Sequence, residues 1–142
     1  MAYCTLTDML DQIEEADLRE LTDDENLGQV SEQRVLKAIA DADAEINGYC
    51  GKRYRVPFGP VPDLIRKISV DIAVYNLFAR RNRPTPQDRR DRYRDAIAFL
   101  RLVAAGSGTL GEDDPSGSPA PAERPTMTGP ARIFSREKLG GW

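Results

Sequence analysis

Apolar side chains between residues 35 and 49 recur at the spacing of an amphipathic helix. They fall on one side of a helix with 3.6 residues per turn: Val35, Ile39, Ala42, Ile46 and Tyr49. The opposite face carries polar side chains: Lys37, Asp41 and Asp43. Ser31 is a candidate N-cap, and Gly48 and Gly51 are candidates for positive φ in the turn that follows. We therefore predict a helix from about Glu32 to Asn47.

Further apolar stripes predict the rest of the fold. A first helix of about two turns begins near Asp8, and one more helical turn is expected over residues 17–22. A helix with a broad apolar face covers residues 64–78, and a last one runs from Pro86 to Gly106. The pattern predicts an all-α protein, a small bundle of about four helices with an extended C-terminal arm.

The turn after the 32–47 helix combines basic and aromatic residues: Tyr49, Lys52, Arg53, Tyr54 and Arg55. Two prolines at positions 57 and 60 follow, and proline excludes both a helix interior and the centre of a sheet. We interpret this turn as a contact surface for another protein. The alternative is an ordinary solvated turn in which Tyr49 and Tyr54 cover the edge of the core.

The C-terminal part changes composition twice. Residues 107–130 consist mainly of Gly, Ser, Pro, Ala, Thr and acidic side chains, which bury too little apolar surface to fold alone. Apolar and basic side chains return after residue 130, among them Phe134, Arg136, Leu139 and Trp142. We predict a body over residues 1–106, a linker over 107–130 and a docking arm over 131–142.

The net charge of −3 hides a strong asymmetry along the chain. Residues 1–47 hold thirteen acidic and three basic side chains, whereas residues 48–111 hold five acidic and thirteen basic ones. Such a division suits nucleic-acid binding by the basic half. It equally suits identical subunits that lay an acidic face against a neighbour's basic face, and a head-to-tail ring uses both faces.

Arginines are concentrated between residues 80 and 94. Arg80, Arg81 and Arg83 close the third predicted helix, and four more arginines alternate with three aspartates in the last helix. Arginine binds DNA phosphates without reading sequence, and no recognition-helix signature is present, so sequence-specific DNA binding is not expected. A subunit-pairing or solvated surface is the other interpretation, with Arg80, Arg81 and Arg83 as candidate interface residues.

The composition argues against an enzyme. Histidine is absent, which removes the commonest general base and the commonest metal ligand. Cys4 and Cys50 stand far apart and form no zinc-binding pair, so we interpret both as reduced packing residues. No stretch approaches the roughly 18 apolar residues of a membrane span. We expect no catalytic site, no cofactor, no metal and no membrane partner.

Four segments resemble a phage family in order and spacing: residues 3–8 (YCTLTD), 40–46 (ADADAEI), 48–54 (GYCGKRY) and 134–139 (FSREKL). The family is the Mu-like prophage proteins of the gene-product-36-like type. The resemblance covers residues 3–111 and 133–142, but not the linker. The helical pattern is also similar to that of head-tail connector, or adaptor, proteins of long-tailed phages.

The resemblance implies a structural virion protein at the neck, synthesised in the host cytoplasm and assembled between portal and tail. Its implied partners are copies of itself in a ring, twelve by analogy with connector rings, the portal protein and a tail-side neck or tail-completion protein. DNA would pass through the lumen without sequence-specific binding. The alternative function is a phage DNA-binding accessory protein for packaging or regulation that uses the basic helices.

Overall fold

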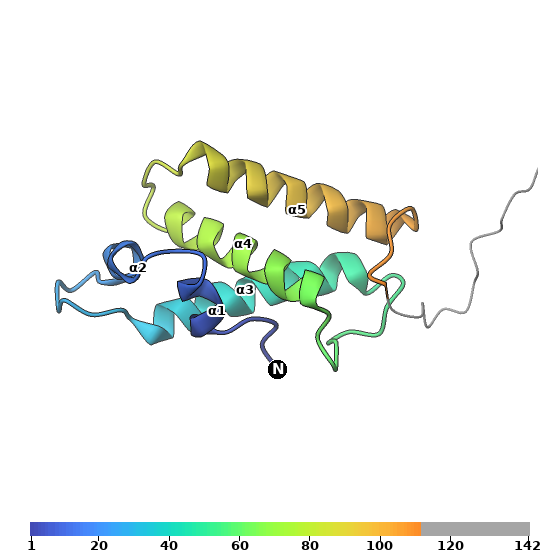
Figure 1. Ribbon diagram of the computed structural model, residues 1–142, viewed down its shortest axis with the longest axis horizontal. Helices are drawn as coiled ribbons and strands as arrows, with labels where there is room; N and C mark the ends of the chain where they lie inside the picture. Colours follow the sequence, from blue (N-terminus) through green and yellow to red (C-terminus); the bar gives the residue numbers. More distant parts are fainter. Residues whose placement is uncertain (112–142) are drawn as a thin grey trace, which may run out of the picture.

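The structure is a computed structural model that describes residues 1–111, and residues 112–142 lie outside the described part (Figure 1). Within residues 1–111 the chain forms five helices and no strand: α1 (Leu6–Leu10), α2 (Glu15–Thr22), α3 (Glu32–Cys50), α4 (Asp63–Ala79) and α5 (Gln87–Ala105). This confirms the predicted small all-α bundle. The helix count exceeds four because the turn expected at 17–22 is a two-turn helix.

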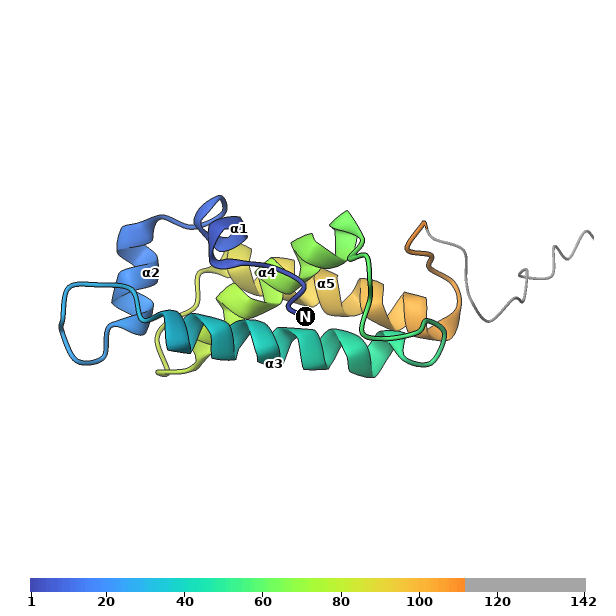
Figure 2. The same cartoon turned by 90° about the horizontal axis from the view of Figure 1, so that it is seen from below.

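The three long helices run along the length of the molecule, with α4 between α3 and α5 (Figure 1). α4 packs against both neighbours, and α1 packs on α3 and α4. α2 lies at one end of the body, whereas the loop of residues 51–62 lies at the other end (Figure 2). The body therefore has two distinct ends.

Helix α3 begins at Glu32 as predicted and ends at Cys50, three residues beyond the expected end. The glycines do not stop it by positive φ: Gly48 is helical, and Gly51 has φ −61°. The chain turns instead because the N–H groups of residues 53 and 54 both donate to the Cys50 carbonyl, at 3.0 and 2.9 Å. The prediction of positive φ at Gly48 and Gly51 was wrong.

Gly106 ends α5 as predicted, with φ +87°. Glycine is required there for two reasons. Other residues adopt this backbone conformation only at a cost, and a Cβ atom would lie 2.5 Å from Nη1 of Arg53. The guanidinium of Arg53 therefore closes over the end of α5. Pro86, expected as the first helical residue, is the N-cap before Gln87.

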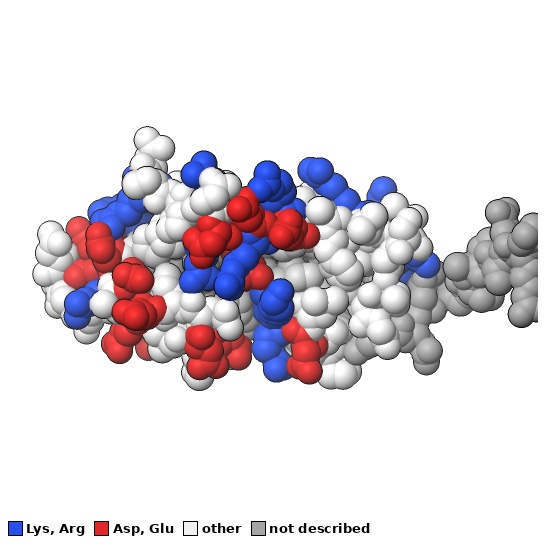
Figure 3. All heavy atoms as spheres, turned by 45° about the horizontal axis from the view of Figure 1, so that its top comes forward, with Lys and Arg blue, Asp and Glu red and all other residues white. Residues whose placement is uncertain are grey.

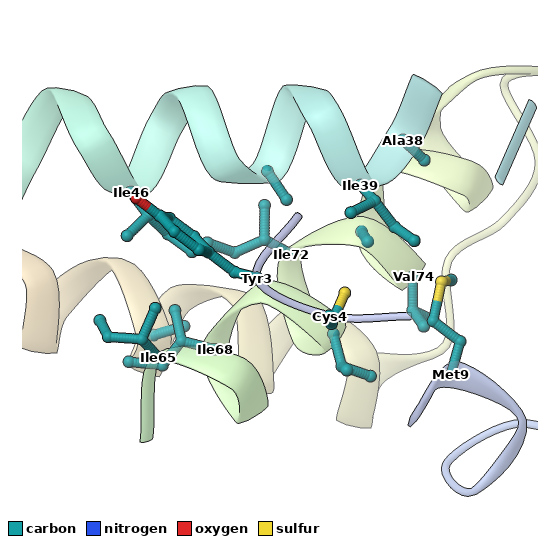
Figure 4. Close-up of a cluster of buried hydrophobic side chains, with 14 of the residues drawn as sticks. Tyr3, Cys4, Met9, Ala38, Ile39, Ile46, Ile65, Ile68, Ile72 and Val74 are labelled. Atoms are coloured by element: carbon teal, nitrogen blue, oxygen red, sulfur yellow. The ribbon is translucent and has the colours of Figure 1, made fainter. Parts of the chain in front are cut away.

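The core lies between the three long helices and contains the predicted stripes (Figure 4). α4 contributes nine buried residues, including Ile65, Ile68, Ile72 and Val74. Its stripe is wider than those of the other helices because α4 is covered on two sides. In α3 the predicted positions 35, 39, 42 and 46 are buried, and Tyr49 is half-buried at the edge.

The N-terminal segment inserts Tyr3 and Cys4 into the core between α3 and α4 (Figure 4). Tyr3 is 2% exposed. Its backbone N–H donates to Oδ2 of Asp43 at 3.0 Å, and its hydroxyl donates to Oδ1 of Asn47. Since both partners lie on α3, the first residues of the chain are fixed to the third helix. No periodic pattern in the sequence predicts this contact.

Asp43 is half-buried, although its place opposite the apolar stripe predicted a solvated side chain. Besides Tyr3, it accepts a hydrogen bond from Oγ of Ser69 on α4 at 2.9 Å. Burial raises the pKa of Asp43, and the hydrogen bonds from Tyr3 and Ser69 oppose that rise. The carboxyl group thus joins the N-terminal segment to α3 and α4.

The loop of residues 51–62 docks on the same tyrosine. The backbone N–H of Phe58 donates to the Tyr3 hydroxyl at 3.1 Å, and the two rings lie 5.7 Å apart. Tyr54 packs on Phe58 at 6.1 Å, and its hydroxyl accepts from the N–H of Leu110 at 3.3 Å. Leu110 is itself buried. These contacts order a proline-containing loop that has no helix or sheet of its own.

Removing the Tyr3 hydroxyl should therefore weaken the body. In Tyr3→Phe, the buried N–H of Phe58 loses its acceptor and Asn47 loses a donor, so we expect a loss of about 1–3 kcal/mol in the free energy of unfolding by urea. Tyr49→Phe is the matched control, because among the described residues the Tyr49 hydroxyl forms no hydrogen bond. Equal stability of the two variants would contradict the assigned role.

Candidate interaction surfaces

The basic aromatic turn divides into an inward and an outward half. Tyr54 is 7% exposed and supports Phe58 and Leu110, while Tyr49 packs at the edge of the core. Lys52 and Arg55 are exposed, and neither forms an ion pair within the described part of the chain. A partner that binds this turn would therefore contact Lys52 and Arg55 before the aromatic rings. The interface role of the turn remains a prediction.

Arg80 and Arg81 pair with an acidic residue of their own chain. Nη2 and Nη1 of Arg80 lie 2.6 and 2.7 Å from the two carboxylate oxygens of Asp24, and Nε of Arg81 lies 3.0 Å from one of them. Nη2 of Arg80 also donates to the Leu21 carbonyl at 2.9 Å. The end of α4 is thereby bound to the segment that follows α2.

A third arginine completes the cluster around Asp24. Nε of Arg34, on α3, lies 3.2 Å from Asp24, and its guanidinium also binds Glu25 and the Thr22 carbonyl. The hydrogen bonds from Arg80, together with attraction from all three arginines, lower the pKa of Asp24 to about 2. We call these residues the Asp24 cluster: Asp24, Arg34, Arg80 and Arg81.

Arg83 lies near the Asp24 cluster and pairs with Glu20 of α2 at 2.6 Å. All three candidate interface arginines of this region thus have acidic partners in the same molecule. The charge asymmetry seen along the sequence is partly neutralised inside the fold, where it holds α2 against α4. Their use in contacts between subunits remains a prediction.

The basic run of α5 is also partly held within the molecule. Arg89 donates to the Gln12 carbonyl at 2.6 Å, and Arg92 lies 3.7 Å from Asp71 and 3.3 Å from Oε1 of Gln12. Figure 3 shows lysine and arginine intermixed with aspartate and glutamate over the face that α5 presents. This mixed surface offers less attraction to DNA phosphates than the sequence alone indicates.

Unpaired charges of opposite sign remain at the two ends of the body. At one end, α2 and the residue before it present three unpaired acidic side chains and one unpaired cation: Glu14, Glu15, Asp17 and Arg19. At the other end lie exposed cations: Lys52, Arg55 and Arg101. Within residues 1–111 none of these seven side chains forms an ion pair, and they leave one end net acidic and the other net basic. We call these two groups the acidic end and the basic end.

The two cysteines are buried, unpaired thiols. Burial raises the pKa of both Cys4 and Cys50 to about 11. Only the thiolate is a strong nucleophile, so neither sulfur is activated at neutral pH. The interpretation of both as packing residues agrees with their place in the core.

The remaining candidate residues, Phe134, Arg136, Leu139 and Trp142, lie outside the described residues, as do the linker and the docking arm. Within the described part, no helix is long and apolar enough to cross a membrane.

The conserved pattern of the family described as Bacteriophage Mu, Gp36 matches residues 3–128 of this chain. The chain belongs to this family. The match includes Tyr3, the Asp24 cluster and both ends of the body, so the geometry described above is that of a Gp36-family protein. The resemblance inferred from the sequence is confirmed, and the protein is phage-related.

Two relatives are similar to this chain over different lengths. The Mu-like prophage FluMu protein gp36 of Haemophilus influenzae is 40% identical over 85 residues, which cover 60% of this chain. That match spans 58% of the Haemophilus protein, less than two thirds of its length. Gene product J of Escherichia phage Mu is 29% identical over 142 residues, with 99% of each chain covered.

Sequence reasoning found the charged residues of the Gp36-family body but not their partners. Asp24 and Arg80 are 56 positions apart, and no helical spacing connects them. The available signal was composition. An acidic connection follows α2 and an arginine cluster follows α4, and in one small fold such segments can pair.

Replacing the carboxylate at the centre of the Asp24 cluster should destabilise the body in a pH-dependent way. An unfolded aspartate titrates near 3.9, so the arginine pairs stabilise the fold fully above that pH and lose their effect as the pH falls toward about 2. We expect Asp24→Asn to unfold at lower urea than wild type at neutral pH, with the difference shrinking between about pH 4 and about pH 2.

Asp17→Asn is the control for this experiment, because Asp17 is exposed and unpaired within the described chain. A difference between wild type and Asp24→Asn that stays constant with pH would show that the ion pairs do not cause it.

Proposed function

We propose that this protein is a structural component of the phage particle, a head-tail connector that forms a ring at the neck between portal and tail. Its membership of the Gp36 family supports a role in a phage, and its small helical body with two oppositely charged ends supports repeated contact between identical copies. Its role is structural and not catalytic.

The observation that carries the proposal is the charge left over after pairing within the chain. Opposite charges at two ends of one body attract in a head-to-tail arrangement, and such heterologous contacts close into a ring when the rotation per subunit permits. The attraction is screened by salt, since both ends are exposed. Free subunits therefore associate weakly, and a preformed ring such as the portal templates the assembly.

The other partners follow from the position at the neck. The portal lies on the head side, a neck or tail-completion protein lies on the tail side, and DNA passes through the lumen without sequence-specific contacts. Twelve copies match a portal of that symmetry. The ring belongs to the virion and assembles in the host cytoplasm.

The second candidate function is a DNA-binding accessory protein for packaging or regulation. The basic end and the arginines of α5 favour it, because exposed cations bind phosphates. Its defining property would be micromolar or tighter binding at about 0.1 M salt that falls steeply as salt rises.

Charge reversal at one end should abolish self-association. Mixing that variant with a second variant that is reversed at the opposite end should restore it. Lys52→Glu with Arg55→Glu leaves both ends acidic, while Glu15→Lys with Asp17→Lys leaves both ends basic. By sedimentation velocity at low salt, we expect each variant alone to be monomeric and their equal mixture to associate as wild type does.

The control is Arg90→Glu with Arg94→Glu on α5, which lowers the net charge as much as Lys52→Glu with Arg55→Glu does, but outside both ends. The head-to-tail contact would be excluded if the control variant lost association as well, or if the mixture of the two reversed variants stayed monomeric.

The position of the protein in the particle separates the two functions. We expect a cryo-electron microscopy reconstruction of the phage neck to show a closed ring of helical bodies against the portal, into which α3, α4 and α5 fit as a unit. Its absence from the particle, together with salt-sensitive DNA binding by the purified protein, would reject the connector and favour the accessory role.

A further inference from the structure

An open groove lies between the first half of α3 and the last turns of α4, with a volume of about 900 Å³. Its apolar lining comes from two helices: Leu36, Ala38, Leu77 and Ala79. Ala38 and Leu77 form a buried floor, whereas Leu36 is 58% exposed at the rim. Leu36 and the buried floor together offer an apolar surface that a further apolar side chain can contact.

The groove is open because α5 does not cover it: no residue of α5 lines it. α5 meets α3 further along, where the Tyr93 hydroxyl donates to Glu45 at 3.1 Å. Before that point, Arg89 and Arg92 hold α5 toward Gln12 and Asp71, on the side of α1. Figure 1 shows α3 and α5 diverging toward the end that carries α2.

Charged residues at the rim of the groove are already paired. Arg34 and Arg80 bind Asp24 and Glu25, and Lys37 binds Asp41 within α3. The groove therefore offers apolar contact without an unpaired charge. Its volume lies in the range of pockets that hold a small ligand or a few side chains, and it is too small for a folded domain.

We infer that this groove receives residues 131–142 of the same polypeptide chain. That segment is richer in large apolar side chains than residues 112–130 before it: Ile133, Phe134, Leu139 and Trp142. Phosphates and nucleic acids do not suit the groove, because its cations are occupied. The proposal does not rest on the connector function and can hold for either candidate function.

The length of chain outside the structure fits this occupant. Gly111 follows Leu110, which is bound to Tyr54 beyond the end of α3. The groove centres near Lys37, 13 residues back along α3, or about 20 Å at 1.5 Å per residue. A random coil of 22 residues, the number that separates positions 111 and 133, has a root-mean-square length of about 25 Å. Span and length match, and such a match gives the highest effective concentration for binding within one molecule.

Trp142 is the only tryptophan of the chain, so its fluorescence reports on the C-terminal segment directly. In the full-length protein we expect blue-shifted emission and protection from acrylamide quenching, both independent of protein concentration. Leu36→Glu places a charge in the groove and should shift the emission to the red and raise the quenching. Ala79→Glu, on the opposite wall, should do the same.

Leu102→Glu is the matched control, because Leu102 is 52% exposed on α5 and lies outside the groove. It should keep the wild-type emission, and far-UV circular dichroism should show all three variants folded. Solvent-exposed emission in wild type, or unchanged emission in both groove variants, would overturn the proposal. Emission that shifts to the red on dilution would also overturn it, since a second copy's segment would then fill the groove.

Discussion

The insertion of Tyr3 between α3 and α4 is the contact on which the rest of the body depends. One buried side chain and its own backbone N–H join three parts of the chain: the N-terminal segment, α3 through Asp43 and Asn47, and the 51–62 loop through Phe58. Ser69 extends the network to α4 through the same aspartate. Buried polar groups are costly when unpaired, so the network tolerates little displacement of any member and fixes how α3 and α4 sit together.

Electrostatics acts at two levels in this molecule. The Asp24 cluster and the Glu20–Arg83 pair use opposite charges to hold α2 and its connection against the end of α4. Part of the charge that stays unpaired lies at the two ends of the body, acidic at one and basic at the other. Contacts between copies can therefore depend on only a few exposed side chains, and these attractions are individually weak and sensitive to salt. Such contacts suit an assembly that is weak among free subunits and is reinforced by a template.

The helices were predictable from sequence because their apolar positions repeat locally, as in the stripe of Val35, Ile39, Ala42 and Ile46. The contacts between distant segments were not. Asp43 lies on the polar face of α3 and becomes half-buried because it contacts Tyr3, 40 positions away, and Ser69 of α4. Tyr54 was identified as part of the turn, but residue type could not show that its ring faces inward. For the same reason, the arginines of the candidate interface were found without their partners at Asp24 and Glu20.

Two kinds of surface therefore remain for partners, and they respond to solution conditions in opposite ways. The charged ends attract less as salt rises, whereas burial of apolar side chains in the α3–α4 groove is strengthened by strongly hydrated salts. In the proposed assembly, the charged ends orient one body against the next. An apolar segment released from the groove adds a contact that salt does not screen. In that proposal orientation and attachment use different parts of the body, since the acidic end, the basic end and the groove share no residue.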